Sequence, residues 1–274
     1  MDRAPEPPAP REERVLLRIL QVGFLRGLFH EAQDAPPAAW GAQPFGIPRS
    51  SGGLLAGLLF PVDAPRGIVL LGHPGIPPGK GYFHRSDRIP FLRERGFAVA
   101  TFDHGGFGES DDPTRLYHEE WADVLAWARR RFPDLPVHVW GVSIGGYFAH
   151  HALAAADEPG VASAIFDQVA PDLLHYKGEG VGSRRIAGLV GAVAAPSALK
   201  WFPAEAHALH VKADRVLYVT GAKDAGIPIE HARRLVAHAN PLARHHVVED
   251  ARHLEAWKLG GDKLRRAVQD ALDG

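Results

Sequence analysis

The sequence predicts an α/β fold in which helices cover both faces of a mostly parallel sheet. Short continuous apolar runs at 67–73 (GIVLLGH) and 97–103 (FAVATFD) are typical of strands buried on both faces. From residue 67 onward, such runs alternate with helical segments, which is the pattern of βαβ crossovers. The length of 274 residues fits one large domain with an insertion better than two independent domains.

The remaining elements follow from the same alternation. Strands are expected at 136–143, 161–170, 215–224 and 243–250, and helices at 86–96, 113–132, 144–157, 228–239 and 254–272. Ser86 is the expected N-cap of the first helix and Gly96 its stop signal. Residues 52–63 indicate one or two antiparallel strands, and the Pro- and Gly-rich stretch 33–50 indicates a connector.

Three parts of the chain differ in pattern. Residues 1–40 hold a polar leader and, at 13–32, the apolar spacing of an amphipathic helix. We expect this helix to pack on the domain, with a membrane-surface helix or a homodimer contact as the alternatives. The core domain comprises 41–170 and 213–274, and 171–212 contains no convincing strand, which predicts a small inserted helical cap.

Composition excludes several classes of function. Hydrophobic residues make up 46 % and charged residues 23 %, as in soluble globular proteins, and the net charge of −1 gives no support for a nucleic-acid partner. The absence of cysteine excludes disulfides, thiolate metal sites and a cysteine nucleophile. Because no secretory signal and no long apolar run are visible, we expect a cytoplasmic protein without stable membrane insertion.

The strongest local signal is the pentapeptide Gly141-Val142-Ser143-Ile144-Gly145, a G-x-S-x-G pattern between a predicted strand and a predicted helix. A sharp strand-to-helix turn strains the serine backbone and tolerates only small flanking residues. It also places the Ser143 hydroxyl at a helix N-terminus, which favours developing negative charge. We therefore predict that Ser143 is a nucleophile; the alternative is a structural serine in a Gly-rich turn.

A serine hydroxyl needs a base to take its proton, and in this arrangement the base comes last in the chain. His253 fits because it follows the last predicted strand and opens the last predicted helix. The competing histidines are His245 and His246 within that strand and His231 and His238 on a helix.

The acid that orients the base is expected just after the preceding strand. Asp224 lies there, in a Gly-containing loop before a helix, where it could hold the imidazole tautomer and stabilise the imidazolium. Asp167, near the end of the strand before that, is the second candidate. For both residues the alternative is a loop or capping carboxylate.

The tetrahedral intermediate of acyl transfer needs N–H donors for its oxyanion. One donor is expected from Ile144, the residue after the nucleophile. The other should come from the loop after the first parallel strand, where Pro74 has no N–H to give. Gly75 is the first choice there and Ile76 the alternative.

Over roughly residues 50–274, the chain resembles the α/β-hydrolase superfamily. The matching motifs are the HPG loop at 73–75, the turn from Asp103 to Ser110, GVSIGG at 141–146, GAKD at 221–224 and the His253 loop. The resemblance implies an eight-stranded, mostly parallel sheet, a structural role for the Asp103 turn, and a cap after the sixth family strand, where 171–212 lies. The commoner His-Gly of the family's oxyanion loop is His73-Pro74 here, as in a subset of the family.

These residues predict a carboxylesterase-like serine hydrolase that cleaves a small ester-like substrate through an acyl-enzyme. We expect no cofactor and no metal. Gly79-Lys80 is followed by Gly81 in place of the Ser or Thr of a phosphate-binding loop, and no G-x-G-x-x-G motif is present at 105–108. The alternatives are thioester, peptide or carbon–carbon hydrolysis on the same triad, or a non-catalytic protein of this fold that binds a ligand.

Overall fold

The computed structural model describes residues 35–76, 78–112, 117–155, 160–170 and 208–274. Their strands form one eight-stranded sheet in the order β1-β2-β4-β3-β5-β6-β7-β8. These are β1 (Gln43–Pro48), β2 (Leu54–Phe60), β3 (Gly67–Gly72), β4 (Phe97–Phe102), β5 (Val137–Val142), β6 (Val161–Asp167), β7 (Ala213–Gly221) and β8 (Arg244–Val248). Only β1–β2 and β2–β4 pair antiparallel, so the predicted mostly parallel sheet is confirmed.

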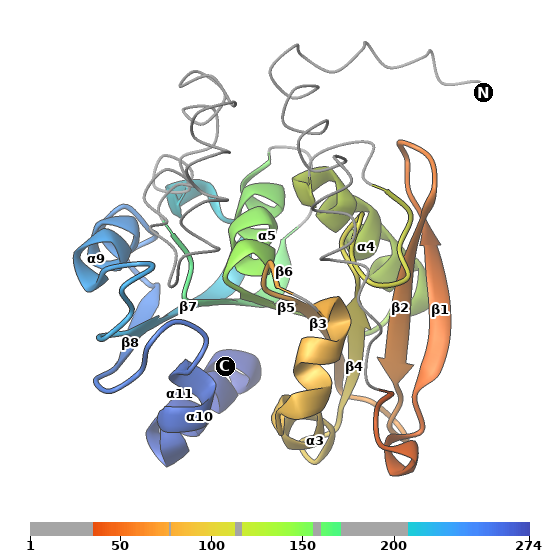
Figure 1. Ribbon diagram of the computed structural model, residues 1–274, viewed down its shortest axis with the longest axis horizontal. Coiled ribbons are helices and arrows are strands. Elements are labelled where there is room, and N and C mark those ends of the chain that lie inside the picture. The colour runs from red at the N-terminus through yellow and green to blue at the C-terminus, as the bar shows by residue number, and fades with distance from the viewer. Residues whose placement is uncertain (1–34, 77, 113–116, 156–159, 171–207) are drawn as a thin grey trace.

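Helices cover both faces of the sheet (Figure 1). One face carries α4 (Tyr117–Arg131), α5 (Ile144–Ala154) and α9 (Ile229–Ala237), and the other carries α3 (Arg88–Arg93), α10 (Ala256–Leu259) and α11 (Gly261–Asp273). The short 3₁₀ helices are η1 (Ala38–Trp40), η2 (Gly79–Arg85) and η4 (Ala208–His210). Along β3, Ile68 and Leu70 join the core with α4 and α5, whereas Val69 and Leu71 join the core with α3 and α11. The alternation of side chains across a strand thus explains the uninterrupted apolar run.

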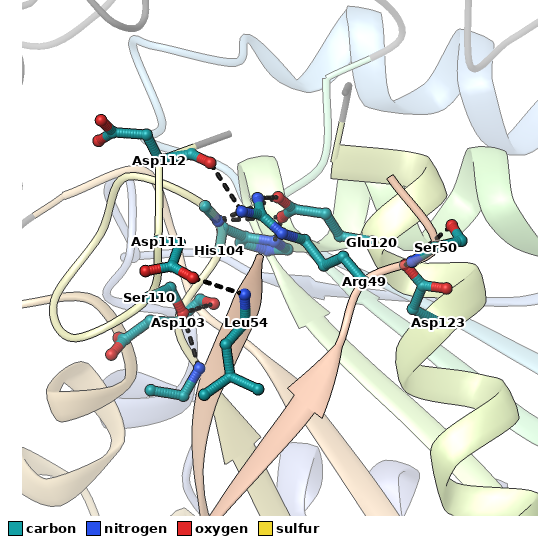
Figure 2. Close-up of polar contacts among 12 residues, drawn as sticks. Arg49, Ser50, Leu54, Asp103, His104, Ser110, Asp111, Asp112, Glu120 and Asp123 are labelled. Carbon is teal, nitrogen blue, oxygen red and sulfur yellow. Dashed lines mark hydrogen bonds and ion pairs between the residues drawn. The ribbon is translucent and has the colours of Figure 1, made fainter. Parts of the chain in front are cut away.

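A buried polar cluster attaches the antiparallel edge of the sheet to the rest of the domain (Figure 2). Arg49, just after β1, forms an ion pair with Glu120 of α4 at 3.1 Å, and both side chains are 1 % exposed. Glu120 also accepts hydrogen bonds from the backbone N–H of Gly105, at 3.0 and 3.2 Å to its two oxygens. Since Gly105 follows β4, this carboxylate joins the edge hairpin, helix α4 and the loop after β4.

The stretch 33–50 was predicted to be a connector, and this was wrong. It contains β1, which pairs in register with β2, so that Ile47 lies opposite Leu55 with both side chains fully buried. Pro44 and Pro48 are tolerated because β1 is an edge strand with a single neighbour. Residues 52–63 accordingly supply one strand, β2, and not two.

Two helix predictions need correction. The helix expected at 254–272 is divided into α10 and α11 at Gly260 and Gly261, and Gly261 has φ +53°, which interrupts a continuous helix. The helix expected at 86–96 is shorter, with Asp87 and not Ser86 at its N-cap.

Residues 1–34 of the predicted N-terminal leader and helix (1–40), and residues 171–207 of the predicted cap (171–212), lie outside the described residues. Among the residues that are described, no helix is long and apolar enough to cross a membrane.

Candidate active site

Ser143 occupies the turn between β5 and α5, where the backbone is strained. Its φ of 51° and ψ of −119° lie in a region that residues with a side chain rarely adopt. A Cβ atom on Gly141 would lie 2.3 Å from the Cα of Gly146, so the helix can approach the strand this closely only because both residues are glycine. The predicted strand–turn–helix setting of the serine is therefore present.

The structure brings Ser143, His253 and Asp224 into one hydrogen-bonded row. Ser143 Oγ lies 3.0 Å from His253 Nε2, and His253 Nδ1 lies 2.8 Å from Asp224 Oδ2. Asp224 follows β7 and His253 follows β8, so the carboxyl ends of parallel strands bring the three residues to one edge of the sheet. With the Nδ1 hydrogen donated to Asp224, Nε2 is left to accept the hydroxyl proton.

The carboxylate of Asp224 is buried, with 3 % of the residue exposed, and each oxygen is hydrogen-bonded. Oδ1 accepts the backbone N–H of Ile227 at 2.7 Å, and Oδ2 accepts the Nε2 of Gln168 at 3.0 Å in addition to His253. Such donors stabilise the ionised form of a carboxylate and fix its orientation.

The competing residues lie elsewhere. Asp167 forms a buried ion pair with Arg88, at 3.0 Å between Oδ2 and Nη2. His245 Nε2 lies 2.9 Å from the hydroxyl of Thr220, and burial lowers its pKa. His238 is exposed and contacts the carbonyl oxygen of its own helix at Arg234.

The loop after β3 lies against the start of α5. A Cβ atom on Gly75 would be 3.1 Å from the Cγ2 of Ile144, so these two residues are neighbours. Ile144 is the first residue of α5, where backbone N–H groups have no partner within the helix. The N–H of Ile76 is donated to the carbonyl oxygen of Pro74 at 2.8 Å, which leaves Gly75 as the better-placed second donor.

His73 holds this loop in shape. Its Nδ1 donates to the carbonyl oxygen of Pro74 at 2.7 Å, and its Nε2 accepts the backbone N–H of His104 at 3.0 Å. Burial, reinforced by the neighbouring His104, keeps the pKa of His73 well below its usual value. The imidazole is therefore neutral and can donate on one side while accepting on the other.

No group of three or more His, Asp or Glu side chains within the described ranges could hold a metal ion. Chemically, the row of Ser143, His253 and Asp224 can pass a proton between the hydroxyl and the imidazole.

The family described as alpha/beta hydrolase fold matches residues 68–178, which include all of β3 but its first residue, the loop at 73–76 and Ser143. The chain has the α/β-hydrolase fold.

Solved structures of two esterases share the fold at low sequence identity. The Pyrococcus furiosus esterase Pf2001 superposes with a TM-score of 0.72 at 16 % identity, covering 89 % of this chain and 97 % of that protein. An esterase from Exiguobacterium antarcticum gives a TM-score of 0.62 at 16 % identity, covering 85 % of this chain and all of that protein.

A curated relative is similar over a short stretch. An uncharacterized 31.7 kDa protein of Escherichia coli, from the traX-finO intergenic region, is 33 % identical over 84 residues. The match covers 28 % of this chain and 28 % of that protein.

Sequence reasoning missed Gln168 and Arg88, both of which lie beside the row of three residues. Gln168 contacts Asp224, and Arg88 contacts Asp167, the candidate acid that the row does not use. Neither belongs to a motif. The only signal was the position of Gln168 directly after a predicted strand of the sheet, where residues meet at the carboxyl edge.

Proposed function

We propose that this protein is a serine hydrolase of carboxylic esters in which Ser143 is the nucleophile, His253 the base and Asp224 the acid. The observation that carries the proposal is the hydrogen-bonded row from Ser143 Oγ to Asp224 Oδ2 through His253, built on a strained turn. Strain of this kind persists where the surrounding structure enforces it, and it is concentrated at functional sites. The esterases with the same fold are consistent with this reaction.

The proposed reaction is a two-step acyl transfer. Ser143 Oγ attacks the ester carbonyl carbon while its proton passes to His253 Nε2, and the N–H groups of Gly75 and Ile144 bind the oxyanion. As the intermediate collapses, the bond to the alkoxy group breaks and His253 gives its proton to the leaving alcohol. Water, deprotonated by His253, then attacks the acyl carbon; the bond to Ser143 Oγ breaks, Oγ takes the proton back from His253, and the acid is released. These steps need no cofactor.

The first test is labelling with a fluorophosphonate probe, followed by intact mass and peptide mapping. The expected result is one adduct, on Ser143, which is absent from Ser143→Ala and strongly slowed in His253→Ala. His238→Ala is the matched control, because that histidine is exposed and lies outside the row. A folded protein that gives no adduct on Ser143 would contradict the proposal and favour a ligand-binding protein of this fold.

Turnover of a series of aryl esters of increasing acyl length, beside a thioester and an anilide, then separates the candidate reactions. We expect the esters to be cleaved with the highest kcat/KM. Ser143→Ala should lose at least about 10⁴-fold in kcat, since removal of a triad nucleophile leaves only the contribution of binding and the oxyanion donors. If a thioester or anilide is cleaved faster than every ester, the proposed substrate class is wrong, whereas the assignment of Ser143 as nucleophile stands.

A further inference from the structure

Gln168 is the residue that follows β6, and its backbone has an unusual conformation. Its φ is +56°, in the left-handed region that favours glycine and asparagine, and only 2 % of the residue is exposed. The backbone N–H of Gln168 donates to the carbonyl oxygen of Val219 in β7 at 2.8 Å, which fixes where the side chain begins. The positive φ turns that side chain toward the loops after β7 and β8.

The two N–H groups of the Gln168 amide have two acceptors. Nε2 lies 3.0 Å from Oδ2 of Asp224 and 2.7 Å from the backbone carbonyl oxygen of Arg252. Asp224 Oδ2 is also the atom that accepts from His253 Nδ1, and Arg252 is the residue directly before His253. One amide therefore joins the carboxylate to the loop that carries the imidazole.

The orientation of this amide is determined by its surroundings. Rotation by 180° would place the carbonyl oxygen Oε1 against a carboxylate and a carbonyl, which are both acceptors. In the observed orientation, Oε1 is buried without a hydrogen-bond partner among the described residues. A buried unpaired acceptor is unfavourable, and so is a positive φ. At Gln168 both unfavourable features occur together with the two hydrogen bonds that the amide N–H groups donate.

The neighbouring residue extends the same connection to the nucleophile. The backbone N–H of Ser143 donates to the carbonyl oxygen of Asp167 at 2.8 Å. The dipeptide 167–168 thus contacts Ser143 through its backbone, Asp224 through the Gln168 amide, and the His253 loop through Arg252. No other function of the Gln168 amide is needed to explain these contacts.

We infer that Gln168 is a positioning residue that holds Asp224 and the backbone before His253 together, so that the imidazole keeps its direction toward Ser143. This inference rests on the proposed function, because it concerns the geometry of the same three residues. A displacement of about 1 Å in a reacting group can reduce the rate by a factor of about 100. Loss of the Gln168 donors should therefore reduce kcat more than it changes KM.

The test compares Gln168→Met, which keeps the approximate length but removes both donors, with Gln269→Met. Gln269 is a suitable control because its amide also donates to a carboxylate, that of Asp273 at 3.3 Å, within α11. We expect Gln168→Met to reduce kcat roughly 10- to 100-fold with KM changed less than about threefold, and Gln269→Met to leave both constants near the wild-type values. Thermal melting establishes that each variant is folded at the assay temperature.

Gln168→Glu supplies a readout that a purely structural role would not change. When protonated, the introduced carboxyl group has one O–H to donate to Asp224, whereas its ionised form places a like charge beside that carboxylate. The ratio of variant to wild-type kcat should therefore fall as pH rises and the introduced carboxyl group ionises. This variant also decides the matter if Gln168→Met does not fold.

The two possible failures are distinguishable. If the wild type does not label at Ser143, the proposed function fails. If the wild type labels and turns over, but folded Gln168→Met has wild-type kcat or Gln168→Glu has the pH profile of the wild type, the positioning role of Gln168 is overturned and the proposed function stands.

Discussion

Two buried carboxylates, Asp167 and Asp224, lie at the carboxyl ends of the neighbouring strands β6 and β7. Their side chains pair with residues of different types, an arginine and a histidine. Asp167 is 1 % exposed and pairs at 3.0 Å with Arg88, whose guanidinium has only N–H donors and cannot accept a hydrogen bond. Asp224 is 3 % exposed and pairs at 2.8 Å with His253, whose imidazole can donate a hydrogen bond through one nitrogen and accept one through the other. The partner, and not the burial, separates a structural carboxylate from a candidate catalytic one.

The surroundings of Arg88 strengthen this contrast. Its guanidinium carbon lies 5.4 Å from the ring centres of Tyr82, Trp140 and Trp257. Aromatic faces stabilise a cation that has lost its water, so Arg88 is held in place from several sides. Asp167 is thereby committed to a fixed ion pair and is not available to orient His253.

The largest difference between the two carboxylates is expected when the kcat of Asp224→Asn is compared with that of Asp167→Asn. Asn at 224 can favour the wrong imidazole tautomer, and a comparable change in a serine-protease triad reduces kcat about 10⁴-fold, so we expect a loss of roughly 10³- to 10⁴-fold. Asp167→Asn should change kcat less than about tenfold, because its carboxylate does not contact His253. Initial rates with an activated aryl ester measure both, after thermal melting shows that the variants are folded.

The opposite ranking, in which Asp167→Asn abolishes turnover and Asp224→Asn does not, would assign the acid to Asp167.

The order of the three candidate residues could be predicted from sequence because each follows a strand of a parallel sheet, and the carboxyl ends of parallel strands meet at one edge. That ground alone does not separate Asp224 from Asp167, because both come at the ends of strands; Asp224 was preferred because it follows the strand directly before the one that precedes His253. The partners of the two carboxylates could not be predicted. Arg88 lies at the start of the short helix α3, and nothing in the local sequence shows that it contacts Asp167. That contact depends on how α3 packs on the sheet.

The other features that were not predicted from the sequence, the contacts of Gln168 and strand β1, have similar physical causes. The contacts of Gln168 depend on a positive φ that no residue pattern indicates. Strand β1 contains two prolines, which indicate a connector unless the strand is already known to lie at an edge. Periodicity therefore predicted the buried parallel strands, whose surroundings are uniform, and failed where one contact or one edge decides the conformation.

The role assigned to Asp167 predicts a large effect on stability. Asp167→Ala leaves the guanidinium of Arg88 buried without its counter-charge, and breaking a buried pair in this way costs about 3–5 kcal/mol. Urea denaturation followed by circular dichroism should show that loss in the free energy of unfolding. The double variant Arg88→Met with Asp167→Leu removes both charges and should recover most of it, since apolar replacements of buried pairs are often neutral.

If the double variant is as unstable as Asp167→Ala, the instability comes from altered packing and not from the unpaired Arg88.

The smallest expected effect concerns a buried histidine that, unlike His253, has a hydroxyl as its partner. His138 of β5 is 2 % exposed, and its Nδ1 lies 2.9 Å from the hydroxyl of Ser163. Burial, together with the positive charges of Arg215 and Arg66, lowers the pKa of His138 from 6.5 to about 4. The folded state therefore favours neutral His138. Its contribution to stability is complete above pH 6.5 and is lost as the pH falls from 6.5 toward 4.

That contribution is no more than about 3.5 kcal/mol, because each pKa unit corresponds to about 1.4 kcal/mol. The free energy of unfolding from urea titrations at pH 7.5 and 4.5 should fall less steeply for His138→Gln than for the wild type. Ser143 labelling at pH 7.5 should be unchanged in the variant, because His138 lies at the amino end of β5 and Ser143 follows its carboxyl end. Equal slopes for the two proteins would show that His138 does not contribute to acid destabilisation. A slowed labelling rate at pH 7.5 would show instead that a change at the amino end of β5 is transmitted to Ser143 at its carboxyl end.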